Sequence, residues 1–461
     1  MEYTIKIPIT ATEETYRILD SQSKILNWCY NHLLGIANEL KKSYIETQNA
    51  SIASTLYTKR GLRNLLPELK QTHPFLKTVH SSPLKNMALR LSSSIQDYQK
   101  SRKGKRKGSA TGWPVFRSFN KKFFSLDYDE PSKGFRLQGN TLELSLGVNA
   151  DAKRLKVNVN LERDFSDFDG VELRNLKIVK NGNQYSACFG VRRKLPKKKK
   201  INKIVSIDPN HKNLGHFVSS AGDSVTIKNL YSLKIMDKRI DQLKSKRDRC
   251  KKKSKKIKLD NKIKYIPSKR WKFFDNKLKE LYRIRQDQTK TYLHTIANKL
   301  YKNYDLVTIG DYTPRGGGIN KGMRRSMNNQ SLRGKFKDCL SWVAEKTGKH
   351  FDIWSERGTT KSCSTPECNY VHKNGLNPNI RWWKCPKCSI VHHRDENASI
   401  NGLNKIINKL PCFGHLEPVD SGNRCVWKFS GLEVLETKLR GPETLEVYLT
   451  GQNCQKIKRV E

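Results

Sequence analysis

The sequence predicts a multidomain α+β protein. A small antiparallel β-barrel with an inserted helical block precedes an α/β domain that carries a cysteine-rich insert. Three observations predict this fold class. The apolar period changes from three-to-four to two near residue 113. Buried-type strands alternate with long helices after residue 199, and two cysteine pairs lie between the last of these strands and the last helix.

The first strand and the helical block occupy the N-terminal quarter. Residues 3–9 alternate between apolar and polar side chains and predict a short strand. Apolar residues then recur at three and four over 12–45, 51–69 and 82–98, which predicts amphipathic helices. The run 101–112 is rich in Lys, Arg and Gly and has no period, so it is expected to be a flexible basic linker.

Six short runs with a period of two follow the linker. They cover 123–126, 135–137, 142–146, 155–161, 176–179 and 185–191. Turn residues such as Gly139-Asn140 separate them, and strands at this spacing predict a small antiparallel barrel. The basic run Leu195–Lys200 resembles a nuclear-import signal, but in so basic a chain a linker that touches nucleic acid is favoured.

Strands with buried-type composition and long helices make up the rest of the chain. The expected strands are 204–208, 215–220, 224–227, 306–311 and 351–356, and the expected helices are 233–303, 336–347 and the segment from Asp395 to Leu410. Residues 315–320 are read as a flexible glycine-rich loop, and residues 411–461 as a loosely ordered tail with few periodic signals.

The charge of the chain indicates a polyanionic partner. Lys and Arg number 90 against 43 Asp and Glu, a formal net charge of +47, and self-repulsion of this size opposes compaction. The charge runs through the whole chain, which favours nucleic acid over a membrane surface. The candidate phosphate contacts are Lys103, Arg106, Lys197, Lys251, Lys252, Arg270 and Arg394.

Neither a bilayer-spanning run nor a signal peptide is evident, so no membrane partner is expected. The odd number of cysteines and their metal-type cluster indicate a reducing compartment. This would be the cytoplasm or nucleoid of a prokaryote, or a eukaryotic nucleus.

Four clustered cysteines predict a structural zinc site. Cys363 and Cys368 form a C-x4-C pair, and Cys385 and Cys388 form a C-x2-C pair. Two such pairs suit a tetrahedral Zn²⁺ ion, and four thiolates leave no open position for catalysis. Four unrelated buried thiols are the alternative, but the other seven cysteines are scattered singly. The neighbouring residues His392 and His393 are not needed as ligands.

Two aspartates stand where a metal-dependent nuclease needs carboxylates. Asp208 ends the buried-type strand 204–208, and Asp395 opens the last helix. Ribonuclease H-like nucleases collect acidic ligands in this way around two divalent ions, Mg²⁺ or Mn²⁺. A turn-forming Asp208 and a helix-capping Asp395 remain the alternatives.

These motifs resemble one known family. Val-Ser-Ile-Asp208-Pro-Asn-His-Lys-Asn, the zinc knuckle and His-Arg-Asp395-Glu-Asn-Ala are similar to TnpB, to its Fanzor relatives and to the type V CRISPR effectors that descend from it. Gly112-Trp-Pro-Val-Phe-Arg-Ser-Phe resembles the segment that opens the family's wedge barrel. The resemblance covers roughly residues 3–410.

The resemblance implies a domain order. It places a wedge-like barrel at 1–11 and 113–198, with a helical recognition domain and the basic linker at 12–112. A RuvC-like nuclease domain at 199–357 and 391–410 follows, with a zinc-binding insert at 358–390. The tail 411–461 lies outside the resemblance.

The second catalytic carboxylate departs from the family pattern. Gly310 stands where the family usually has glutamate, in the run Thr-Ile-Gly310-Asp311-Tyr. Some TnpB branches and the Fanzor proteins carry the glutamate just before the zinc segment, where this chain has Glu356. The resemblance therefore implies the set Asp208, Glu356 and Asp395, which would also bind Mg²⁺, with Asp311 as the fallback.

The implied function is RNA-guided cleavage of double-stranded DNA, with a guide RNA as partner. Three alternatives remain open at this stage: a catalytically inactive RNA-guided DNA-binding protein, a transposase-like DNA strand transferase, and a non-enzymatic zinc and RNA-binding protein. The sequence leaves the choice between monomer and dimer open.

Overall fold

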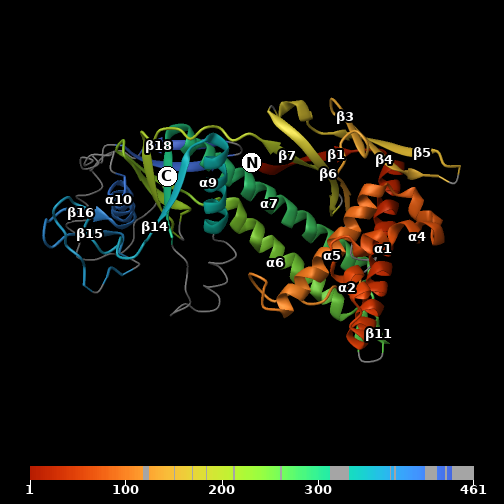
Figure 1. Cartoon of the computed structure of the whole chain (residues 1–461). Coiled ribbons are helices and arrows are strands. Elements are labelled where there is room, and N and C mark those ends of the chain that lie inside the picture. Colours follow the sequence, from red (N-terminus) through yellow and green to blue (C-terminus); the bar gives the residue numbers. More distant parts are fainter. Residues whose placement is uncertain are drawn as a thin grey trace. The chain divides into compact units, whose positions relative to one another are not determined.

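The computed structural model describes residues 1–117, 124–149, 151–168, 170–182, 184–210, 213–259, 262–311, 332–373, 375–377, 380–410, 423–430 and 433–438. The chain divides into two compact units, Met1–Lys194 and Leu195–Glu461 (Figure 1). No helix in these described ranges is long and apolar enough to span a membrane. The expected glycine-rich loop at 315–320 lies outside them.

A seven-stranded antiparallel sheet organises the first unit, in the order β2-β6-β7-β1-β5-β4-β3. The strands are β1 (Glu2–Thr10), β2 (Phe124–Tyr128), β3 (Phe135–Gln138), β4 (Thr141–Val148), β5 (Arg154–Leu161), β6 (Val171–Asn181) and β7 (Gln184–Arg193). This is the predicted first strand plus the six predicted later ones.

The sheet is not flat, and it does not close. β2 and β3 are its two edges although they follow each other in the chain. Flat strands would place these edges about 29 Å apart, whereas the link from Tyr128 to Phe135 reaches at most about 25 Å. No ladder joins β2 to β3 in the described part of the sheet, so the expected barrel is a half-open one. The link contains Pro131, which cannot donate to a ladder, and Ser132 at a φ of 71°.

The helical block lies between β1 and β2 in chain order, as predicted. It comprises α1 (Glu13–Thr47), α2 (Ala50–Tyr57), α3 (Gly61–Asn64), α4 (Leu66–Thr72), a 3-10 turn η1 (Pro74–Thr78) and α5 (Ser81–Arg102). Thr12 caps α1, because its Oγ1 accepts a hydrogen bond from the Thr15 amide at 3.2 Å. Buried residues of α1 and α5, such as Leu33 and Leu91, share one apolar core with the sheet.

A second seven-stranded sheet organises the other unit, in the order β14-β13-β8-β9-β10-β17-β18. The strands are β8 (Ile204–Asp208), β9 (Gly215–Ser219), β10 (Asp223–Ile227), β13 (Leu306–Gly310), β14 (His350–Trp354), β17 (Asn423–Ser430) and β18 (Glu433–Lys438). β8, β13 and β14 are parallel, and β9 runs antiparallel to β8 and β10.

Helices cover both faces of this sheet. Side chains alternate between the faces of a strand, so Val205 and Phe217 lie in the core with α7 (Lys269–Asn303) and α9 (Arg333–Thr347). Ile204 and Val218 pack on the other face against α10 (Arg394–Ile407). Gly402 allows this close packing, because a Cβ there would lie 2.7 Å from Ser206 Oγ.

The C-terminal strands correct one prediction. Residues 423–438 were expected to belong to a loosely ordered tail, but β17 pairs with β10 in parallel and β18 pairs with β17. The physical reason is burial: Trp427 is 3% exposed and contacts the Phe217 ring edge-on at a centroid distance of 5.0 Å. The Lys299 ammonium also lies over the Trp427 ring, 4.2 Å from its centroid.

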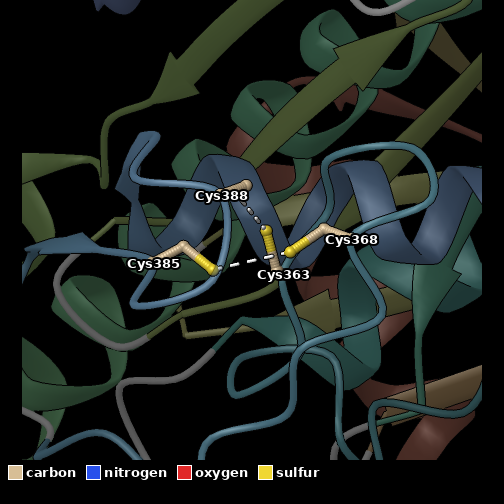
Figure 2. Close-up of side chains that lie close together, drawn as sticks. All are labelled: Cys363, Cys368, Cys385 and Cys388. Atoms are coloured by element: carbon tan, nitrogen blue, oxygen red, sulfur yellow. Dashed lines mark hydrogen bonds between the residues drawn. The ribbon is translucent and has the colours of Figure 1, made fainter.

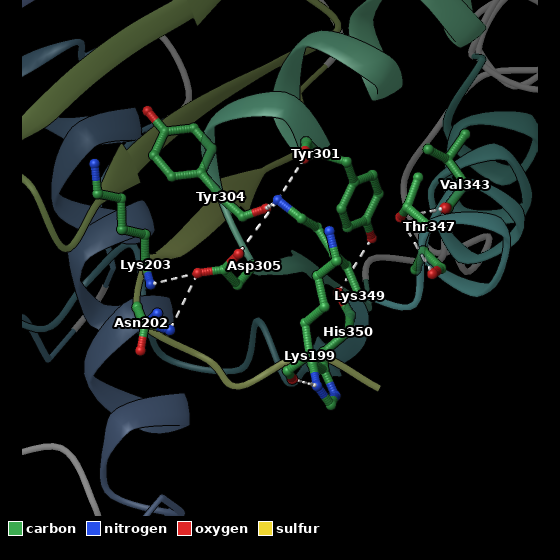
Figure 3. Close-up of polar contacts among 11 residues, drawn as sticks. Lys199, Asn202, Lys203, Tyr301, Tyr304, Asp305, Val343, Thr347, Lys349 and His350 are labelled. Atoms are coloured by element: carbon green, nitrogen blue, oxygen red, sulfur yellow. Dashed lines mark hydrogen bonds and ion pairs between the residues drawn. The ribbon is translucent and has the colours of Figure 1, made fainter. Parts of the chain in front are cut away.

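The basic segment 195–203 precedes β8 and is attached to the second sheet by hydrogen bonds (Figure 3). The backbone amides of Asn202 and Lys203 donate to Asp305 Oδ2 at 3.1 and 3.2 Å. Asp305 Oδ1 lies 3.2 Å from Lys349 Nζ, which is largely buried and also donates to the carbonyls of Tyr301 and Tyr304 at 2.6 and 3.0 Å. One carboxylate therefore joins this segment to the end of α7 and the start of β14.

We expect Asp305→Asn to lower the free energy of unfolding at neutral pH by about 1–3 kcal/mol, because charge-assisted hydrogen bonds are lost. Burial alone would raise the pKa of Asp305, but the amides of Asn202 and Lys203 and the Lys349 ammonium outweigh it and lower the pKa. Stability from a lowered pKa is full above the unfolded-state value, about 3.9. It is lost as the pH falls through the folded-state value.

Urea unfolding between about pH 7 and pH 3 measures this difference. The gap between the wild type and Asp305→Asn should be constant above about pH 5 and should close toward pH 3. A gap that stays constant to pH 3 would contradict the assignment. Asp352→Asn, at an exposed carboxylate of β14, is the matched control.

Candidate functional site

The carboxyl ends of three parallel strands meet at one edge of the second sheet. Ile207 of β8 pairs with Ile309 of β13, and Gly310 of β13 pairs with Trp354 of β14. Asp208 is the last residue of β8, and Glu356 follows β14 by two residues. The three buried-type strands of the sequence therefore end side by side, and two of the predicted site residues lie at their ends.

Asp208 is deeply buried at this edge. Its exposure is 6%, and burial raises its pKa well above the ordinary value. The negative charges of Glu356 and Asp395 raise the pKa further, while Arg394 and Arg333 act in the opposite direction. The structure thus brings together all three carboxylates of the predicted set.

Glu356 occupies the space beside Gly310. A Cβ added at Gly310 would lie 2.6 Å from Glu356 Cγ and 2.7 Å from Cδ, and it would also collide with Oε1. No side chain fits at position 310 while Glu356 keeps this conformation. The glycine that departs from the family pattern therefore makes room for the carboxylate expected to replace the missing glutamate.

Asp311 has a different place in the structure. Its side chain is exposed, and its Oδ1 accepts the backbone amide of Glu356 at 3.0 Å. The Asp311 amide donates to the carbonyl of Trp354 at 2.9 Å. The fallback residue therefore holds the loop that carries Glu356, and its backbone extends the pairing of β13 with β14.

Asp395 is the second residue of α10, in its first turn, and is 6% exposed. Asn210 Nδ2 donates to its Oδ2 at 2.9 Å. Arg381 Nη1 donates to both carboxylate oxygens, at 3.0 and 3.1 Å. Arg381 was missed by sequence reasoning, since it lies fourteen residues before Asp395 and reaches it only through the fold of the insert.

Lys405 supports the loop around Glu356 from the opposite side. Its Nζ donates to the carbonyls of Ser355 at 2.8 Å and Arg357 at 3.1 Å, on either side of the glutamate. Burial lowers the pKa of Lys405, and the charge of Asp311 opposes this shift. Lys405 and Asp311 together fix the backbone from which Glu356 projects.

For the Mg²⁺-dependent DNA cleavage that the sequence predicts, we expect Lys405→Met to raise the Mg²⁺ concentration needed for half-maximal cleavage by about tenfold, the lower end of the cost of losing an outer-shell partner. Met keeps the length of the apolar stem but cannot donate to the two carbonyls. Cleavage assays across a Mg²⁺ titration measure the effect. Lys405→Arg should recover most of it, and Lys409→Met, two residues beyond the end of α10 and exposed, should behave as the wild type. An unchanged Mg²⁺ requirement in Lys405→Met would exclude this positioning role.

The four predicted zinc ligands converge in the insert between β14 and α10 (Figure 2). The Sγ atoms of Cys363, Cys368, Cys385 and Cys388 all lie within 4.8 Å of one another. The 363–388 and 368–385 sulfur pairs are 3.7 and 3.6 Å apart. A tetrahedral zinc ion with 2.3 Å bonds requires sulfurs about 3.8 Å apart, so this donor set fits Zn²⁺.

The turns that carry the cysteines are tight. The Cys368 amide donates to the Thr365 carbonyl at 3.2 Å, and the Cys385 amide donates to that of Ile390 at 2.9 Å. A short antiparallel pair, β15 (Trp382–Lys384) and β16 (Val391–His393), frames the second turn. His392 Nε2 lies 3.1 Å from Cys363 Sγ, which places this histidine against the quartet without adding a fifth ligand.

Two asparagines attach the first cysteine loop to α10. Asn397 is 1% exposed; its Oδ1 accepts the Ser364 amide at 2.9 Å, and its Nδ2 donates to the carbonyls of Thr359 and Ser362 at 3.2 and 2.8 Å. Asn401 Nδ2 donates to the same two carbonyls at 2.9 and 2.8 Å. The loop that contains Cys363 is thereby held on the helix whose first turn contains Asp395.

The predicted phosphate contacts are dispersed over the chain. Lys103 ends α5, and Arg106 lies in the basic linker of the first unit. Lys197 belongs to the basic segment 195–203, while Lys251, Lys252 and Arg270 lie where α6 (Tyr231–Lys252) ends and α7 begins. Arg394 opens α10, and its charge acts on Asp208. Of the seven, Arg394 is thus the one placed at the carboxylate site.

Comparisons with known proteins identify part of the chain and its fold. Residues 334–402 match a family model described as Cas12f1-like, TNB domain. This range begins in α9 and includes β14, the cysteine quartet and much of α10. Comparison with curated proteins gives no match.

Among solved structures, a Cas12f1–sgRNA–target DNA complex is 12% identical with a TM-score of 0.52, over 87% of this chain and 98% of that one. A CRISPR-Cas_phi3 endonuclease is 11% identical, with a TM-score of 0.40 over 90% and 94%. Alicyclobacillus acidoterrestris C2c1 with single-guide RNA is 9% identical, with a TM-score of 0.37 over 95% and 73%. The likeness of fold rests on the first of these.

Proposed function

The chain carries a Cas12f1-like TNB region and has the fold of a compact type V CRISPR effector, and from this premise we propose that it is an RNA-guided DNA endonuclease. Guide RNA and target DNA are the two partners in the solved Cas12f1 complex. The net charge of +47 suits a protein that holds both. Base pairing with the guide would supply most of the sequence specificity.

One observation carries the proposal: Asp208 ends β8, Glu356 follows β14 and Asp395 lies in the first turn of α10, and the charges of Glu356 and Asp395 both act on Asp208. Buried carboxylates of like charge are costly unless cations neutralise them. Hard oxygen donors fit Mg²⁺ or Mn²⁺, which when bound would supply an activated water and stabilise the leaving oxygen of a phosphodiester. The order β14-β13-β8-β9-β10, with β9 antiparallel, supports a ribonuclease H-like domain.

The chain's own residues hold this site in shape. Asn210 orients Asp395, while Asp311 and Lys405 fix the loop of Glu356. Arg381 places positive charge against Asp395. With about a third of its side chain exposed, Arg381 is available to contact a phosphate that enters beside the aspartate.

The domain roles follow the same proposal. The half-open barrel and helical block, predicted as the wedge (1–11 and 113–198) and recognition domain (12–112), would grip the RNA and the guide–target heteroduplex through phosphates and A-form shape. The region 199–357 with 391–410 would cut the DNA. Zn²⁺ at the quartet in 358–390 would be structural, because four thiolates complete its coordination.

Sequencing the RNA that co-purifies with the protein tests the function. A discrete RNA carrying a variable guide segment is expected, and the complex should cleave plasmid DNA that matches this segment in the presence of Mg²⁺. Asp208→Ala should retain the RNA and lose cleavage. Cleavage independent of the RNA, or joining of DNA ends in place of hydrolysis, would overturn the proposal.

A further inference from the structure

A long basic arm extends from the second sheet. Helices α6 and α7 run side by side (Figure 1), and a two-stranded hairpin, β11 (Lys256–Leu259) with β12 (Lys262–Tyr265), links their far ends. Residues of α7 that share the core of the sheet begin at Tyr292. At 1.5 Å per residue, the twenty-three residues before it carry the arm about 35 Å beyond this core.

The charge of the arm is extreme and largely unpaired. Residues 244–272 contain fifteen Lys and Arg and two Asp. Among those cations whose side chains the structure describes, ion pairs are made by Arg247, to Asp248 at 3.0 Å and Asp275 at 3.3 Å. So many neighbouring positive charges repel one another, and a bound polyanion would relieve this repulsion.

Aromatic rings alternate with these cations on the surface of the arm. Phe273, Tyr282 and Tyr265 are 56, 41 and 38% exposed. Each has a lysine ammonium near its face: Lys277 at 5.5 Å, Lys244 at 5.5 Å and Lys251 at 5.3 Å from the ring centroids, respectively.

The arm does not use these rings as a core. Few apolar side chains of the arm are buried. Between residues 240 and 282, the structure describes two of them as buried, Ile240 and Leu278. A helical pair stabilised for its own sake would turn its large aromatic residues inward.

We infer that this arm binds an unpaired segment of RNA. The lysines would contact successive phosphates, and the exposed rings would stack on bases that are not already stacked in a helix. Duplex DNA offers phosphates but no unstacked bases, so it would contact the lysines and leave the rings unused. The inference rests on the proposed function, since it names the guide RNA as the source of that segment.

Binding of labelled oligonucleotides to the full-length protein, stripped of RNA at high salt, tests the inference. The probes are a 20-nucleotide oligouridine, an oligothymidine of the same length and a 20-base-pair DNA duplex. One variant combines Phe273→Ala and Tyr282→Ala, and a second combines Lys251→Gln, Lys252→Gln and Lys256→Gln. A matched control combines Lys302→Gln, Lys346→Gln and Lys428→Gln, which are exposed lysines of the same unit outside the arm.

The ring variant should bind oligouridine about tenfold more weakly per ring and the duplex as before. The lysine variant should reduce the slope of log affinity against log salt for oligouridine by about 2, at 0.7 per phosphate contact. Both variants should keep the wild-type melting temperature, because the replaced side chains are exposed. The inference would be overturned if the ring and lysine variants bound oligouridine as tightly as the control variant does.

Two further results for the ring variant would also overturn the inference: equal losses of binding for oligouridine and duplex DNA, and a larger loss for oligothymidine than for oligouridine. The first would make the arm a general electrostatic surface, and the second would assign it to a displaced DNA strand. Failure of the proposed endonuclease is recognised separately. A wild type that never cleaves DNA, yet binds oligouridine through its arm, refutes the nuclease and keeps the arm.

Discussion

Replacing Glu356 with glutamine is expected to lower Mg²⁺-dependent DNA cleavage by at least about 100-fold. The loss of an outer-shell partner already costs up to about 100-fold, and Glu356 would be a direct ligand. RNA and DNA binding should remain at the wild-type level. Glutamine keeps the size and shape of the side chain beside Gly310, so the fold is preserved. It removes the negative charge that would hold a divalent ion against Asp208. Single-turnover cleavage with matched target DNA measures the loss.

Asp311→Asn is the matched comparison, because it changes the neighbouring carboxylate that served as the alternative. Asparagine can still accept the Glu356 amide, so cleavage should fall by less than about tenfold. Full cleavage by Glu356→Gln together with complete loss in Asp311→Asn would reverse the assignment of the second catalytic carboxylate.

A paired exchange gives a stricter check of the same geometry. Gly310→Glu alone should inactivate the protein, because its Cβ would collide with the Glu356 side chain. Combining Gly310→Glu with Glu356→Gly removes the obstruction and returns a carboxylate to the same space from β13 instead of from the loop after β14. Partial recovery of cleavage in the double variant is expected, and no recovery would show that the two positions do not share one site.

Periodicity and spacing predicted the features that depend on local sequence. The alternation in β1 to β7 gave seven strands, and the two cysteine pairs gave a metal-type quartet whose sulfurs converge. Asp208 and Asp395 stood out because one ends a buried strand and the other opens a helix. Glu356 required a different kind of signal: position 310 is a glycine, whereas the family resemblance implied a carboxylate there.

Features that depend on distant pairing were harder to predict. β17 lies sixteen residues beyond α10 and pairs in parallel with β10, nearly two hundred residues earlier. The alternating apolar residues Cys425, Trp427 and Phe429 carried a weak period-two signal for it. The sequence carried no signal for the ion pair of Arg381 with Asp395, because this pair depends on how the insert folds around its cysteines.

Removing one quartet thiol is expected to release the zinc ion and to uncouple the insert from α10, whose first turn contains Asp395. Cys385 is fully buried, and Cys385→Ser would leave three thiolates and a weaker donor. Metal binding supplies folding free energy to small metal-held segments. Without it, the loop at 359–364 should lose the register in which Asn397 and Asn401 hold it.

Elemental analysis should find about one zinc per wild-type chain and almost none in Cys385→Ser. Cleavage should fall by about 10–100-fold, the range seen when partners outside the first ligand shell are lost. Oligouridine binding should persist, because the basic arm has its own hairpin and helices. Cys250→Ser, at a cysteine of the arm outside the quartet, should keep both zinc and cleavage. Wild-type cleavage by a zinc-free Cys385→Ser would show that the insert does not hold Asp395 in place, and the quartet would then serve the fold of the insert alone.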